Sequence, residues 1–139
     1  MSEVMFFSDE VDFSLENEKD VSDWMIQIAN SEEKILSDLN VIFTSDDKLL
    51  KINKDFLDHD YYTDIVTFQN VEGEINGEIY ISVDRVKENA EENKVGFVTE
   101  LHRVMAHGIL HMAGYGDKSN EEIKAMRSKE DFYINLRPV

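Results

Sequence analysis

The sequence predicts a single α+β domain over residues 1–139, in which helices cover a small mixed sheet of four strands. Segments with helical and strand patterns follow one another in mixed order, which is typical of this class. The chain has 139 residues, of which 42% are hydrophobic, so it can bury one core. It contains one proline and no run rich in glycine or serine, and we therefore expect no linker.

Four short segments have the composition of β-strands. Three of them are apolar runs with β-branched or aromatic residues, at 5–7, 41–43 and 65–68. The fourth covers residues 75–82 and alternates isoleucine with other side chains. Because a turn at Gly73 separates the last two segments, we expect them to pair as a hairpin.

Apolar residues at helical spacing predict five helices. The first is expected over residues 21–38, with Asp20 as its N-cap. Ser45 is expected to cap the second, and the third and fourth are predicted over 83–93 and 97–113. The apolar face of the first helix is predicted to hold Val21, Trp24, Met25, Ile28, Ile35, Leu36 and Leu39.

The last helix carries a clear start signal. Ser119 and Glu122 have the spacing of a capping box, in which each side chain bonds the backbone N–H of the other residue. We expect Ile123, Met126 and Phe132 to face the core from this helix.

Charge and composition restrict the location and the partners. The net charge is −16, and in residues 1–47 only Lys19 and Lys34 oppose the acidic side chains. Such a surface argues against a general nucleic-acid binder, although simple solvation also explains it. The chain has no cysteine, no apolar run long enough for a bilayer and no basic region at Met1, so we expect a cytoplasmic protein without disulfides or membrane contact.

The segment from His107 to Asp117 predicts a metal site on a helix–turn motif. His107 and His111 are four residues apart and therefore share one helix face, about 5–6 Å apart at Cβ. Gly114 allows the helix to end, and the reversed chain returns Asp117 toward the same ion. Two histidines and one carboxylate leave a fourth position open, as in catalytic zinc sites. We expect Zn²⁺, with Mn²⁺ or Ni²⁺ as possible substitutes because a carboxylate ligand suits them.

Three neighbouring residues bear on the chemistry. The ligand spacing is similar to that of metzincin metalloproteases, which place a glutamate base after the first histidine, but this chain has Gly108 there. A metalloprotease is therefore an alternative function only if another residue serves as the base. Arg103 lies one turn before His107 and is a candidate to stabilise charge on a phosphate; alternatively it pairs with Glu100 or Asp117. His102 is off this face, and we expect an ordinary surface or packing residue.

Several stretches resemble the YbeY family of bacterial metal-dependent endoribonucleases. Residues 107–117 read His-Gly-Ile-Leu-His-Met-Ala-Gly-Tyr-Gly-Asp, close to the family's His-Gly-x-Leu-His-Leu-x-Gly-Tyr-Asp-His. Residues 63–68 resemble its Thr-Asp-Val-Leu-Ser-Phe stretch, and 77–82 its Gly-Asp-Ile-x-Ile-Ser strand. The resemblance extends over residues 40–132 in the expected order.

The resemblance implies a zinc-dependent endoribonuclease that matures ribosomal RNA, notably near the 3′ end of the small-subunit RNA, and acts in ribosome quality control. The implied partners are ribosomal RNA and the small ribosomal subunit. A second hypothesis follows from the acidic surface: the protein is an assembly factor that acts mainly through ribosomal or assembly proteins. Filter binding to small-subunit RNA, with and without ribosomal proteins and at two salt concentrations, distinguishes the two.

Two positions depart from the family pattern. Most members have a third histidine where this chain has Asp117, which remains able to bind a metal. A family arginine to which a catalytic role is ascribed falls at Leu57, which carries no charge. His59 and Arg103 are the candidates to take over this role, and the alternative for His59 is an exposed loop residue.

Overall fold

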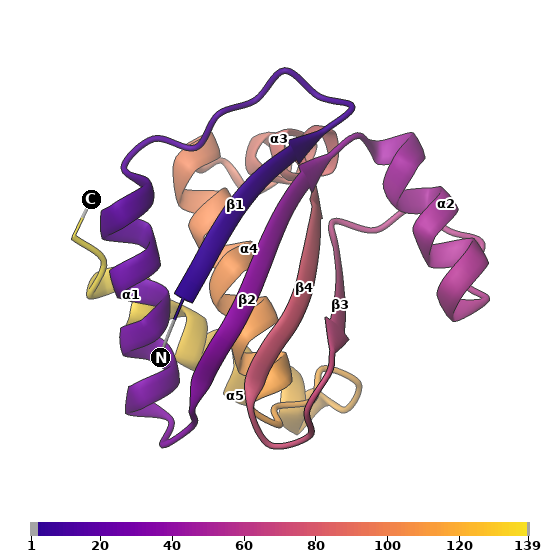
Figure 1. Ribbon diagram of the computed structural model, residues 1–139. Helices are drawn as coiled ribbons and strands as arrows, with labels where there is room; N and C mark the ends of the chain where they lie inside the picture. The colour runs from indigo at the N-terminus through magenta and orange to yellow at the C-terminus, as the bar shows by residue number, and fades with distance from the viewer. Residues whose placement is uncertain (1–2, 139) are drawn as a thin grey trace.

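The computed structural model describes residues 3–138, in which one mixed sheet of four strands confirms the predicted α+β class (Figure 1). The strand order is β1-β2-β4-β3; β1, β2 and β4 are parallel, and β3 runs antiparallel to β4, as the predicted hairpin requires. The strands are β1 (Glu3–Asp9), β2 (Leu36–Thr44), β3 (Ile65–Gln69) and β4 (Ile75–Ser82).

Five helices surround this sheet within the described residues. In Figure 1, α1, α3, α4 and α5 lie behind the sheet, whereas α2 stands beside β3. The main core fills the space between the sheet, α1 and α4, with Trp24, Phe43 and Ile109 among its buried residues. The helices are α1 (Glu18–Ser31), α2 (Asp46–Leu57), α3 (Val83–Asn93), α4 (Phe97–Met112) and α5 (Asn120–Asn135).

The predicted first helix is too long at its C-terminal end. Helix α1 ends at Ser31, where Glu33 adopts a left-handed backbone conformation (φ 59°), and Leu36 begins strand β2. Leu36 and Leu39 are buried as strand residues, because i, i+3 apolar spacing also arises by chance in a buried strand. The N-cap is Asn17 rather than Asp20, so that end was also placed wrongly.

Helix α5 begins as predicted but presents a different face to the core. Ser119 accepts from the Glu122 backbone and Glu122 from the Ser119 backbone, which confirms the capping box. The expected inward residues Ile123 and Phe132 are about half exposed, 48% and 54%. Met126 is buried as predicted, and Glu130 and Tyr133 complete the buried face in place of the other two. A buried glutamate within this face was not expected from an apolar pattern.

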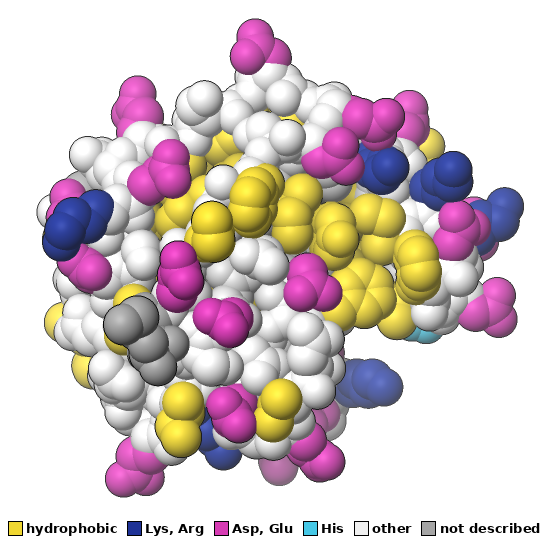
Figure 2. Space-filling model, in the orientation of Figure 1, with side chains coloured by type: hydrophobic (Ala, Val, Ile, Leu, Met, Phe, Trp, Pro, Cys, Tyr) yellow, Lys and Arg dark blue, Asp and Glu magenta, His cyan; other side chains and the backbone are white. Residues whose placement is uncertain are grey.

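The front face of the sheet is only partly covered. Met5 and Phe7 of β1 remain exposed there, and Figure 2 shows an apolar band with acidic side chains spread around it. The acidic surface agrees with the net charge of −16. None of the helices between residues 3 and 138 is long and apolar enough to cross a membrane.

A glycine sets how closely α4 approaches the sheet. A Cβ added at Gly108 would lie 2.9 Å from Ile65 Cδ1 and 3.0 Å from Ile79 Cδ1, tighter than ordinary carbon contacts. Gly108 therefore lets α4 lie against β3 and β4. This contact leaves His107 and His111 at the edge of the helix–sheet interface, beside two surface cavities.

Candidate active site

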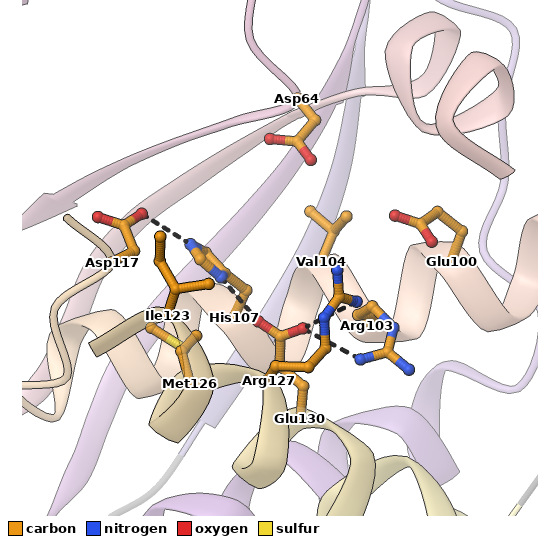
Figure 3. Close-up of a pocket in the computed structure, with 10 residues that line it drawn as sticks. All are labelled: Asp64, Glu100, Arg103, Val104, His107, Asp117, Ile123, Met126, Arg127 and Glu130. Atoms are coloured by element: carbon orange, nitrogen blue, oxygen red, sulfur yellow. Dashed lines mark hydrogen bonds and ion pairs between the residues drawn. The ribbon is translucent and has the colours of Figure 1, made fainter. Parts of the chain in front are cut away.

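Two adjoining cavities meet at Asp64, His107 and Asp117. The first, which we name the α5 cavity, has a volume of about 280 Å³ and is walled by α4 and α5. The second, the loop cavity, has a volume of about 380 Å³ and is walled by α4, β3 and the loop after α2. The α5 cavity, shown in Figure 3, is lined by Asp64, Glu100, Arg103, Val104, His107, Asp117, Ile123, Met126, Arg127 and Glu130.

His107 is held between two carboxylates at this junction (Figure 3). Its Nδ1 lies 2.8 Å from Glu130 Oε2, and since a carboxylate accepts, Nδ1 carries the donated proton. Its Nε2 lies 3.5 Å from Asp117 Oδ2. Burial alone would lower the pKa of His107, but the hydrogen bond and charge of Glu130, with the charges of Asp64 and Asp117, raise it.

The pair formed by His107 and Asp117 suits a shared metal ion. Two ligands of a tetrahedral zinc with bonds of ~2.0–2.1 Å lie about 3.3 Å apart, close to the observed 3.5 Å between Nε2 and Oδ2. Glu130 on the other ring nitrogen is the usual outer partner of a metal-bound histidine. The donor atoms present therefore fit zinc at two of the three predicted positions.

The third predicted ligand, His111, is less closely placed. It lines the loop cavity with His107 and Asp117, but its side chain is exposed near the end of α4. Within residues 3–138, no three His, Asp or Glu side chains are already gathered closely enough to hold an ion. The His107, His111 and Asp117 ligand set therefore stays a prediction.

The turn after α4 has the backbone expected from the sequence. Gly114 has a φ of +112°, in the left-handed region that favours glycine, and the Tyr115 N–H donates to the Leu110 carbonyl over 3.0 Å. The chain reverses there, and Asp117 consequently faces His107.

Arg103 lines the α5 cavity, but both its ion-pair partners are on α5. Its guanidinium donates to Glu130 over 3.1 Å and to Asp131 over 2.7 Å. The predicted pairing with Glu100 or Asp117 is wrong, because α5 packs across α4 and brings closer carboxylates. Its role in stabilising phosphate charge stays a prediction.

The loop after α2 reaches the site as well. Leu57 and His59 both line the loop cavity with His111. The exposed His59 ring stacks on Tyr61 at 5.2 Å, and its Nδ1 lies 3.0 Å from the Tyr61 hydroxyl. The structure thus brings His59 to the cavity containing the predicted ligands, whereas its catalytic role stays a prediction.

Two acidic residues at the site were missed as functional candidates. Asp64 lines both cavities, and burial raises the pKa of its carboxyl although His107 opposes the shift. Glu130 is 5% exposed and contacts both His107 and Arg103. The sequence signals available for them were the YbeY-like stretch at 63–68, which contains Asp64, and the overall extent of the resemblance, residues 40–132, which contains Glu130.

Comparison with known proteins decides the family. The family model described as Endoribonuclease YbeY matches residues 4–136. The chain belongs to the YbeY family. It is 48% identical over 136 residues to Endoribonuclease YbeY of Cytophaga hutchinsonii, covering 96% of this chain and 95% of that protein. It is also 49% identical over 131 residues to Endoribonuclease YbeY of Flavobacterium johnsoniae, covering 94% of each.

A solved structure supports the same fold. The solution structure of a target protein from Thermotoga maritima matches with a TM-score of 0.66 and 30% identity, over 96% of this chain and 87% of that one. The YbeY resemblance seen in the sequence is thereby confirmed. The peptidase alternative is not favoured, and the packing agrees, because position 108 is buried against Ile65 and Ile79 and lines neither cavity.

Proposed function

We propose that this protein is a cytoplasmic, metal-dependent endoribonuclease that cleaves single-stranded RNA during ribosomal RNA maturation. The substrate in this proposal is small-subunit RNA near its 3′ end, and the partner is the small ribosomal subunit during quality control. The observation that carries the proposal is His107, held between Glu130 and Asp117 at the junction of two cavities. Family membership supports it, since relatives at up to 49% identity are named Endoribonuclease YbeY.

His107, His111 and Asp117 are the residues that would hold one zinc ion, with manganese or nickel as substitutes. When bound, such an ion supplies a Lewis acid that polarises a phosphoryl oxygen. Glu130 fixes the ring of His107 and its tautomer, and so aims Nε2 at the ligand position. The exposed His111 would complete the set through a side-chain rotation at the end of α4.

Asp64 is the residue best placed to accept a proton. Its carboxyl faces both cavities, and among residues 3–138 the side chain that donates to it is the Asn89 amide, at 3.4 Å. In the reaction, Asp64 would take the proton from the attacking hydroxyl, whether of water or of the ribose 2′-OH. When the ribose 2′-OH attacks, the P–O5′ bond breaks as the new P–O2′ bond forms; when water attacks, one P–O ester bond breaks as the new P–O bond forms. In both cases the leaving oxygen takes a proton from solvent water. The raised pKa of Asp64 brings it closer to the range of an effective general base.

Elemental analysis and an RNA cleavage assay test the proposal together. The purified chain should contain one zinc per molecule and should cleave a small-subunit 3′-end RNA in a reaction that a chelator stops. His111→Ala should lose both metal and cleavage while remaining folded, because the side chain is exposed. Lys87→Ala, an exposed change on α3 that lines neither cavity, is the control. Full cleavage by a His111→Ala protein without metal would contradict the proposal.

A further inference from the structure

The walls of the two cavities are acidic, although the substrate in the proposed function is a polyanion. Asp64 and Asp117 line both cavities, and Glu100 and Glu130 line the α5 cavity. An RNA phosphate brought near these carboxylates is repelled unless a cation compensates. Over residues 3–138, the Lys and Arg side chains that line either cavity are Arg103 and Arg127, both in the α5 cavity.

The two arginines differ in how far their charge is already compensated. The Arg103 side chain is 19% exposed and bonds Glu130 over 3.1 Å and Asp131 over 2.7 Å. The Arg127 side chain is 59% exposed, and its ion-pair partner is Glu130 at 3.9 Å, the outer limit for such a pair. The same oxygen of Glu130 already accepts from Arg103. Arg127 therefore retains most of its donors for a ligand.

Arg127 is also well placed along α5. It precedes Glu130 by three residues, so both lie on the same side of the helix, and Figure 3 shows it beside Glu130 and Arg103. Glu130 in turn bonds His107, the residue at the junction of the cavities. A guanidinium here can reach a phosphate held in the α5 cavity while its stem remains on the helix surface.

We propose that Arg127 binds a backbone phosphate of the RNA beside the scissile bond. This inference rests on the proposed function and specifies how the acidic site holds its anionic substrate. A guanidinium can donate two parallel hydrogen bonds to one phosphate, which supplies orientation as well as charge. Leu57 lines the loop cavity without charge, whereas Arg127 would supply its positive charge from the α5 cavity.

Binding of a short single-stranded RNA to matched variants tests the inference. Affinity is measured by fluorescence anisotropy at several salt concentrations, on the protein with its metal retained and with a 2′-O-methyl RNA that resists cleavage. We expect Arg127→Ala to weaken binding about fivefold at low salt and to reduce the slope of log K against log salt by about 0.7, the value for one phosphate contact on a single strand. Arg127→Lys should recover most of the affinity but not all of it, because lysine binds phosphate as a point charge.

Lys87→Ala is the matched control, since it removes the same unit of charge from an exposed position that lines neither cavity. It should change affinity less than twofold and leave the slope unaltered. Equal effects of Arg127→Ala and Lys87→Ala would overturn the inference while leaving the proposed function intact, provided that the wild-type chain still cleaves RNA. A wild-type chain that neither binds nor cleaves RNA would overturn both.

Discussion

Two histidines on α4 show how one helix gives the same side chain opposite properties. His102 is 2% exposed, lies 5.6 Å from the Trp24 ring, and its Nδ1 accepts from Arg137 over 3.0 Å. Burial, with a contribution from the Arg137 charge, lowers the pKa of His102 to about 4. His107, five residues later, faces Glu130, Asp117 and Asp64, and its pKa is raised despite its burial.

The contrast separates a packing histidine from a functional one. A buried histidine beside a cation is held neutral and contributes to the core, as expected for His102. A histidine beside carboxylates keeps one nitrogen oriented and the other open to a ligand. The charges that decide between these outcomes come from other elements. For His107 the charge is Glu130 on α5, and for His102 it is Arg137 in the segment after α5.

The largest effect should come from removing the charge that faces His107. We expect Glu130→Gln to weaken zinc binding about 10- to 100-fold, because the carboxylate orients the His107 ring and raises its basicity. Equilibrium dialysis of the purified protein measures this affinity. Asp131→Asn is the control, since it removes the exposed partner of Arg103 without touching His107. A Glu130→Gln protein that binds zinc as tightly as the wild type would contradict this account of the site.

The opposite face of α4 should instead show an acid-sensitive stability. The pKa of His102 is about 4 in the folded protein against an ordinary 6.5, so the unfolded chain binds more protons between these values. His102 therefore leaves the free energy of unfolding almost unaffected above about pH 6.5. It lowers that free energy as the pH drops toward 4, by roughly 2 kcal/mol between pH 7 and pH 5. Denaturant unfolding of wild type and His102→Gln across this range measures the difference. Identical pH dependence in both proteins would contradict the prediction.

A cluster of polar side chains around Glu32 connects the end of α1 to the turn that carries Asp117. Glu32, just after α1, accepts hydrogen bonds from the hydroxyls of Tyr115, over 2.7 Å, and Tyr133. Lys129 forms an ion pair with the same carboxylate at 3.2 Å. Tyr115 lies in the turn that carries Asp117, whereas Tyr133 lies on α5. Glu32 thereby restrains the loop and the helix from one point.

The smallest predicted effect comes from a matched pair of substitutions at Tyr115 and Tyr133, the two tyrosines that donate to Glu32. Tyr115→Phe and Tyr133→Phe each remove one hydroxyl from Glu32, and each should cost about 1–3 kcal/mol of stability. Tyr115→Phe should in addition speed amide exchange in residues 113–118 and weaken zinc binding about threefold, because the loop opens more often. Hydrogen exchange and dialysis measure both. Equal zinc affinity in the two variants would show that the cluster only stabilises the fold.

Local patterns predicted much of the fold. The hairpin of β3 and β4, the Ser45 cap and the capping box at Ser119 all appear as expected, because each depends on neighbours within a few residues. The first helix was extended to residue 38 because Leu36 and Leu39 match helical and strand spacing alike. The inward face of α5 was misjudged because a buried glutamate at position 130 interrupts its apolar pattern.

The segment of residues 107–117 contains features set by the sequence and features set by the fold. The sequence by itself determined that His107 and His111 share a helix face, that the helix ends at Gly114, and that the chain resembles the YbeY family, since these are properties of spacing and residue type. Only the tertiary structure decided that His107 is the histidine that contacts carboxylates. It also decided that Arg103 is already paired while Arg127 is exposed. Those outcomes depend on how α5 crosses α4, which brings together residues more than twenty positions apart in the chain.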